Sequence, residues 1–318
     1  MKSKFMRRGS CLILAGLLAV SMTACGKPSA KKLSDAAEKK VEAEEIALED
    51  LKDTDNSKKN QKALKNGLLV NTTGEEFVDV FEDELEGFKI EDFGEPYDID
   101  LEDFEAEDFK NISVYAKGDN LTGSENMKDV DLELVCVVEF EDSKKSDELF
   151  EDLMDKFEDL ADDADIDLED LSKDEYMNKG NKGHLIINIE AAAVFDVMFE
   201  LQEGQGDMFN DDVKEAYKDT VGDLRIVIGF YYEGGVMTTI IGLSGDDMED
   251  ISTLAKAIGV KDPLTIESND EMANAFVALY APSYYAYLAK AQEAAQLIRE
   301  HNEEVEAVKE EIDSSLEG

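Results

Sequence analysis

The stretch RIVIGFYYE-GG-VMTTIIGL, residues 225–243, decides the fold of the central part of the chain. Two runs rich in β-branched and aromatic residues flank a Gly-Gly pair, which predicts a β-hairpin because both glycines tolerate the positive φ angles of a primed turn. In that register one face of the first strand meets one face of the second: Ile226, Ile228, Phe230 and Tyr232 with Leu243, Ile241, Thr239 and Met237. We expect this face to lie in the core.

Regular apolar patterns extend outward from the hairpin in both directions. Alternation from Val130 to Phe140 predicts a strand, with a partner at 112–117, and the apolar run 184–190 predicts another. Apolar stripes predict amphipathic helices. They are expected at 146–161, up to residue 201, at 211–221, at 248–258 with a stop at Gly259, and at 268–281.

Both ends of the chain have helical patterns of a different kind. A charged helix is expected near 33–52, and a long helix is expected to run from Pro282 to about residue 316. Apolar residues seven apart give the long helix a coiled-coil-like seam, which allows either pairing with the first helix or self-association. The resulting fold class is α+β: an antiparallel or mixed sheet with helices packed on it, plus long N- and C-terminal helices.

The first residues have the three parts of an export signal: a basic start, an apolar run from Cys11 to Val20, and small residues. The apolar run is too short to span a bilayer, which needs about 20 residues. Met22-Thr23-Ala24-Cys25 follows and resembles the lipobox of bacterial lipoproteins, although Met22 stands where Leu is commonest. This resemblance implies that residues 1–24 are removed and that Cys25 carries lipid.

These patterns divide the chain into four parts. Residues 1–24 are the signal peptide, and 25–67 are a lipidated N-terminus with a charged helical tether. An acidic α+β domain follows at 68–263, and a helical region at 264–318. The resemblance places the protein on the extracytoplasmic face of a cell membrane, and two or more acyl chains would hold it there.

The chain is strongly acidic, with 77 Asp and Glu against 32 Lys and Arg and a net charge of −45. Removal of residues 1–24 takes away four basic side chains and no acidic one, so the charge becomes −49. Nucleic acid is excluded as a partner, since binding it needs a basic face. Lys27 to Lys40 is the exception, with five lysines against two acids, and we expect this run to contact anionic headgroups while the acidic domain stands away from them.

An acidic segment interleaved with phenylalanines lies between Glu75 and Asp108, with seventeen acidic residues and one lysine. Such alternation is typical of disordered interaction segments, but helical spacing in its first half favours folding. Both interpretations stay open, as does the order of residues 88–110.

Few residues suit catalysis. Cys136 lies on the apolar face of an expected strand and is interpreted as a buried structural thiol. Each of the two histidines, His184 and His301, lacks a Cys or His at ligand spacing, and His184 is expected at a surface loop end. Carboxylate pairs are too numerous to identify a hydrolase site. We therefore assign no catalytic residue.

One candidate metal site remains, at Asp163, Asp165 and Asp167. Their spacing resembles the start of an EF-hand Ca²⁺ loop, but Leu168 occupies the position that needs Gly, and Asp174 stands where Glu is required. We therefore expect no cofactor and interpret this segment as a solvated acidic turn, with weak Ca²⁺ binding as the alternative. A tyrosine cluster between Tyr280 and Tyr287 has two interpretations, core packing or a partner surface.

Taken together, the sequence predicts a membrane-anchored extracytoplasmic lipoprotein with a non-enzymatic binding or envelope-associated domain. Its partner would be an unidentified protein or envelope component. The alternatives are the solute-binding lipoprotein of an importer, which would have two α/β lobes, and a surface hydrolase that uses carboxylates.

Overall fold

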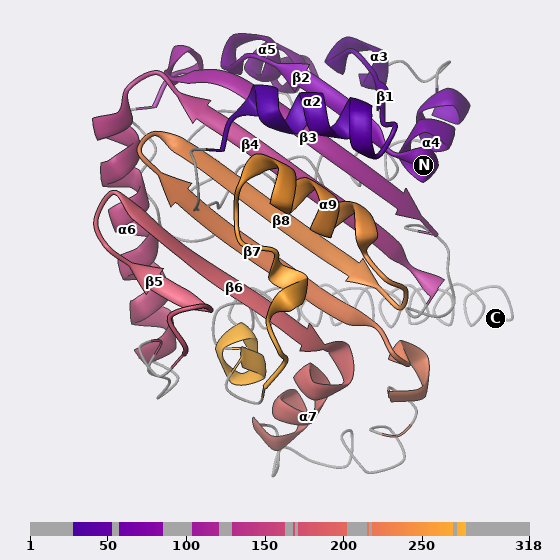
Figure 1. Cartoon of the computed structure of the whole chain (residues 1–318), viewed down its shortest axis with the longest axis vertical. Helices are drawn as coiled ribbons and strands as arrows, with labels where there is room; N and C mark the ends of the chain where they lie inside the picture. Colours follow the sequence, from indigo (N-terminus) through magenta and orange to yellow (C-terminus); the bar gives the residue numbers. More distant parts are fainter. Residues whose placement is uncertain are drawn as a thin grey trace, which may run out of the picture.

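A computed structural model describes residues 28–52, 57–84, 104–120, 129–162, 168, 171–201, 215, 218–269 and 272–277. Eight strands form one sheet in the order β1-β2-β3-β4-β8-β7-β6-β5 (Figure 1). β1 and β2 are parallel, and every other neighbouring pair is antiparallel. The expected α+β class with a mixed sheet is therefore confirmed. The strands are β1 (Glu44–Glu45), β2 (Leu68–Thr72), β3 (Phe109–Asp119), β4 (Asp131–Phe140), β5 (Tyr176–Asn178), β6 (Lys182–Glu190), β7 (Arg225–Glu233) and β8 (Val236–Ser244).

The described helices connect or cover these strands. None of them is long and apolar enough to cross a membrane. The expected helices at 146–161, up to 201 and at 248–258 are confirmed as α6, α7 and α9, and a left-handed Gly259 with φ 88° ends the last of these. The helices are α2 (Ala30–Lys40), α3 (Leu48–Lys52), α4 (Ser57–Asn66), α5 (Gly74–Glu84), α6 (Ser143–Asp162), α7 (Ala191–Leu201) and α9 (Glu249–Ile258), with short 3₁₀ turns η4 (Ala106–Asp108) and η7 (Pro263–Thr265).

The hairpin predicted at residues 225–243 is confirmed in detail. Gly234 and Gly235 both have positive φ, 55° and 85°, as a primed two-residue turn requires. The four predicted cross-strand pairs are all present: Ile226 with Leu243, Ile228 with Ile241, Phe230 with Thr239, and Tyr232 with Met237.

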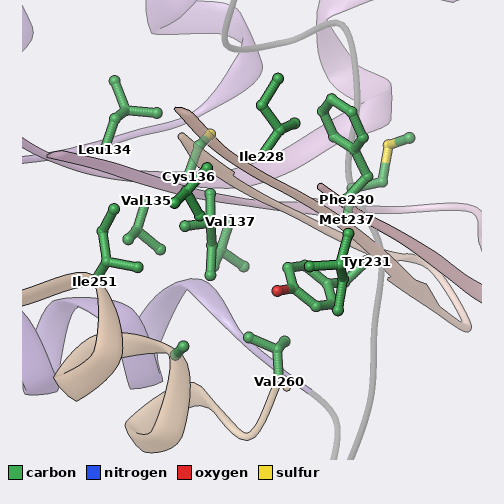
Figure 2. Close-up of a cluster of buried hydrophobic side chains, with 14 of the residues drawn as sticks. Leu134, Val135, Cys136, Val137, Ile228, Phe230, Tyr231, Met237, Ile251 and Val260 are labelled. Carbon is green, nitrogen blue, oxygen red and sulfur yellow. The ribbon is translucent and has the colours of Figure 1, made fainter. Parts of the chain in front are cut away.

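Side chains from both faces of the central strands are buried. On one face, Val135 and Tyr231 lie towards α2 and α9, together with Ile251 of α9 (Figure 2). Leu134 and Phe230 point to the opposite face (Figure 2). On that face α6 contributes aromatic contacts. We call these the α9 face and the α6 face. The α6 contacts include a stacked pair, Phe150 with Tyr232, and a tilted pair, Phe157 with Phe230.

The N-terminal segment differs from the expected tether. α2 ends at Lys40, the backbone turns at Glu42 with φ 55°, and the chain then forms β1 beside β2, so there is no continuous helix over 33–52. α2 packs on β3, β4 and α9, and Leu33 and Ala37 are fully buried. The sheet domain therefore includes residues 29–52, because the apolar side of this lysine-rich helix covers the α9 face.

Several expectations concern residues outside the described part of the chain. The long C-terminal helix after Pro282 is one of them, together with its seam and His301. Within the region expected to be separate, 264–318, Ile266 and Met272 belong to the same core as the sheet. Of the segment 88–110, the structure describes residues 104–110, which form η4 and the start of β3 and bury Phe104.

Gly183 offers a test of how the β5 edge and α6 pack on β6. A Cβ atom at this position would lie 2.4 Å from the carbonyl oxygen of Met177 in β5 and 2.9 Å from Cζ of Phe150 in α6. Gly183→Ala must displace one or both, so we expect the free energy of unfolding in urea to fall by about 1–3 kcal/mol. The exposed Lys179→Ala should change it by less than about 0.5 kcal/mol. Equal stabilities for the two variants would contradict the close packing at Gly183.

Candidate functional site

The residues assigned from sequence as sites lie outside the described part of the chain. This applies to the lipidation residue Cys25, to the Ca²⁺ candidates Asp163, Asp165 and Asp167, and to the tyrosines from Tyr280 to Tyr287. Within the part that the structure describes, no group of three or more His, Cys, Asp or Glu side chains is arranged to hold a metal ion. Lipidation and Ca²⁺ binding therefore stay predictions.

Cys136 is a buried thiol, as expected. It lies on β4 beside Val114 of β3 and Thr239 of β8, and it points to the α6 face (Figure 2). Burial raises the pKa of the thiol to about 12. At neutral pH the group is therefore protonated and unreactive, because the thiolate is the nucleophile.

The main polar cluster of the described core lies where the N-terminus of α9 meets β3 and β4. It consists of Tyr115, Lys117, Glu133 and Asp250, and we call it the α9 charge cluster. Lys117 Nζ lies 3.2 Å from Glu133 Oε1 and 2.7 Å from Asp250 Oδ2. The Tyr115 hydroxyl donates to Asp250 Oδ2 at 2.8 Å. One lysine thus bridges two carboxylates from separate elements.

Glu133 also accepts a hydrogen bond from the backbone of α9. The Ile251 N–H donates to Glu133 Oε2 at 2.9 Å. The residue before α9, Met248, makes no side-chain capping bond. Since the first N–H groups of a helix have no partner within it, Glu133 supplies from β4 the acceptor that a capping residue would normally supply.

Burial dominates the electrostatics of the cluster. Glu133 is 2% exposed, and burial raises its pKa above the ordinary 4.5, with Asp250 adding to the effect, while the Ile251 N–H and Lys117 oppose it. Burial also raises the pKa of Tyr115, helped by its hydrogen bond to Asp250. For Lys117, burial lowers the pKa, but the hydrogen bond to Asp250 and the charges of both carboxylates outweigh it and raise the pKa overall.

The cluster is suited to holding α9 on the sheet. Lys117 lies between the two carboxylates, so both are engaged with a cation, whereas glycoside hydrolysis needs one carboxyl group free as acid and another as base or nucleophile. The solvent-facing edge of the α9 charge cluster is formed by Lys117 and Asp250, whose side chains are 30% and 23% exposed. We interpret the cluster as a docking contact that is closed by its own members.

His184 contradicts the expectation of a surface position. It lies within β6, opposite Met177 of β5 and Tyr231 of β7, and is 6% exposed. Neither ring nitrogen has a hydrogen-bond partner among the described residues. The neighbouring charges are Asp174 and Lys261, which pair with each other at 2.9 Å.

Burial is the main cause that lowers the pKa of His184 below 6.5. The positive charge of Lys261 acts in the same direction, whereas Asp174 and the backbone of Lys173 oppose it. The imidazole is therefore held neutral in the folded protein.

The sequence contained a signal for the burial of β4 on both faces, although not for the α9 charge cluster itself. Residues 134–138 form an uninterrupted apolar run, which is typical of a strand buried on both faces. Glu133 directly precedes that run, and the structure shows that it is buried as well. Comparisons with protein-family models, with curated proteins and with solved structures gave no match for the chain.

Two substitutions separate the capping role of Glu133 from its charge. Glu133→Gln keeps an oxygen that can accept from the Ile251 N–H and removes a buried ionisable group, so we expect little loss of stability at neutral pH. Glu133→Ala removes the acceptor and leaves Lys117 with one carboxylate, so the free energy of unfolding should fall by about 1–3 kcal/mol. Equal losses for the two variants would contradict the capping role.

The stability difference between the unmodified protein and Glu133→Gln should depend on pH. Because the pKa of Glu133 is raised on folding, protonation favours the folded state as the pH falls through that pKa towards 4.5. The stability of the unmodified protein relative to Glu133→Gln should therefore increase in this range. Titrating groups that do not interact with Glu133 cancel in the difference, which denaturant unfolding at several pH values would measure.

His184→Leu should make the stability of the protein less sensitive to acid. Below pH 6.5 the unfolded chain binds a proton at His184, whereas the folded protein resists it, so the unmodified protein loses stability as the pH falls. The Leu variant lacks this loss. Its stability relative to the unmodified protein should therefore rise as the pH falls from about 8 to about 5. A stability difference that does not vary with pH would contradict the buried neutral imidazole.

Proposed function

We propose that this protein is exported, cleaved before Cys25 and held by lipid on the extracytoplasmic face of a membrane, where its sheet domain acts as a non-enzymatic binding or envelope-associated module. The sequence Met22-Thr23-Ala24-Cys25 carries this proposal, because it combines an export signal with an acylation cysteine.

Cleavage at this site is compatible with the described fold. Every helix and strand that the structure describes begins at residue 30 or later. Removal of residues 1–24 would therefore take away none of them. The first described helix, α2, begins five residues after Cys25.

The two alternatives have weaker support. An importer's solute-binding protein is expected to have two α/β lobes, whereas the described strands all belong to one sheet. A carboxylate hydrolase needs an unengaged pair of carboxyl groups, whereas Lys117 bridges Glu133 and Asp250. A binding role requires neither two lobes nor an unengaged pair of carboxyl groups. It is also compatible with a core in which the charged groups hold helices in place.

Lipidation is tested by labelling bacteria that express the full chain with an alkyne-bearing palmitate analogue. We expect the label on the unmodified chain, a loss of label in Cys25→Ser, and release of the Cys25→Ser protein from the membrane fraction into the soluble fraction. Cys136→Ser is the matched control and should keep both the label and the membrane fraction, because Cys136 is buried. An unlabelled Cys25 chain would overturn the proposal.

A further inference from the structure

The chain is fixed to the sheet immediately after the proposed lipidation site. The Ser29 side chain caps α2 by accepting from the Lys32 N–H at 3.2 Å. The Ala30 N–H donates to Glu139 Oε1 on β4 at 2.8 Å. Leu33, one turn later, is fully buried. Ser29 and the residues after it in α2 therefore belong to the folded domain.

This attachment limits how far the domain can lie from the lipid. Ser29 is four positions after Cys25 in the chain, and an extended chain spans at most about 3.3–3.6 Å per residue. The start of α2 therefore lies within about 14 Å of a lipidated Cys25. A domain held so closely cannot stand far from the bilayer.

The register of the strands shows which end of the sheet this contact involves. Glu139 is paired with Val236, next to the Gly234-Gly235 turn, and Phe140 is paired with Phe109. The β7–β8 turn and the start of α2 lie at the left of the sheet in Figure 1. We define the proximal end by residues 28–32, 108–110, 139–145, 178–182 and 233–236. The distal end comprises residues 118–120, 129–132, 223–225 and 243–247.

The charges at the proximal end are compatible with an anionic surface. Lys31 and Lys32 are exposed on the first turn of α2. Other lysines at or near the proximal end pair with carboxylates and so offset the negative charge of those carboxylates. These pairs are Lys110 with Glu141, Lys144 with Glu148, Lys145 with Asp108, and Lys182 with Glu233.

Carboxylates at the distal end are too far away to repel the lipid strongly. Strands of nine or ten residues, such as β8 and β4, extend about 30 Å at about 3.3 Å per residue. The Debye length at physiological ionic strength is about 8 Å. Acidic residues such as Asp131 and Asp246 are therefore separated from the headgroups by several screening lengths.

From this geometry we propose that the proximal end lies against the headgroups of the bilayer and that the short link from Cys25 to α2 holds it there, so that the distal end points away from the membrane. The orientation rests on the proposed lipidation. It replaces the expected standoff on a basic tether, because α2 lies on the sheet and its last lysines, Lys39 and Lys40, are about 14–15 Å along the helix from its start.

Energy transfer to the membrane tests the orientation in the lipidated full chain. A donor fluorophore is attached at Lys144→Cys, whose native side chain is 82% exposed at the proximal end, or at the exposed distal position Asp246→Cys. The protein is reconstituted in phosphatidylcholine–phosphatidylglycerol vesicles with headgroup acceptors. We expect transfer at least about twofold higher from position 144, because the sheet separates the two positions by about 30 Å.

A matched variant tests the role of the link. Insertion of about 20 Gly and Ser residues between Gly26 and Lys27 gives a flexible tether and should bring the ratio of transfer efficiencies close to one. Equal transfer in the parent protein, or a ratio that the insertion leaves unchanged, would overturn the proposed orientation. Vesicle flotation separates this outcome from failure of lipidation: protein that does not float lacks the anchor, and the orientation fails with it.

Discussion

The antiparallel pairing of β4 with β8 joins the two parts of the described structure. Strands β1–β4 precede α6 in the chain and β5–β8 follow it, so this one pairing makes a single sheet of two sets of strands. Apart from η4 and the helical residues 218–221, the order β-α-β-β-α occurs on each side of it, from β2 to α6 and from β6 to α9. The strands β2-β3-β4-β8-β7-β6 are arranged symmetrically about the pair. The symmetry does not extend to the final helices, because α6 contacts Phe230 and Tyr232 whereas α9 lies on the opposite face, beside Val227 and Gly242.

Burial of the central strands on both faces makes a polar residue there costly unless it has a partner. Glu133 meets this requirement by binding Lys117 and the N-terminus of α9, so the same carboxylate that would be unfavourable alone also attaches the covering helix. Asn188 acts similarly in β6. Its side-chain amide donates to the carbonyls of Pro263 and Ile266 and accepts from Arg225 Nη2, which attaches the segment after α9 to the sheet. Polar groups of the strands thus fix helices and turns at defined positions.

The elements that the sequence predicted well are those specified by local patterns. The Gly-Gly turn, the apolar pattern of β4 and the glycine at the end of α9 each depend on neighbouring residues only. The position of α2 does not, because its apolar side consists of Ala30, Leu33, Ala36 and Ala37, a small stripe that is buried only once β3 and β4 provide a surface. β1 and β5, with two and three residues, are too short to show a period. The surface position expected for His184 was wrong, because its burial depends on pairing with β5, which local patterns do not predict. The α9 charge cluster depends on contacts between residues 115 and 250 that no local pattern contains.

The acidic side chains of the described structure are placed according to one rule. A net charge of −45 opposes compaction through self-repulsion, so carboxylates must either reach water or have a donor. Those in the interior have donors: Glu133 as above, and Asp262, which binds the Leu264 N–H and Lys256. The acids of α6 lie mainly on its exposed side, opposite the buried Phe150, Leu153 and Phe157. Because exposed charges more than about 8 Å apart are largely screened, this arrangement limits the self-repulsion of the folded chain. The fold thus depends on the sheet and the few charges within it, whereas most of the described acidic side chains lie at the surface.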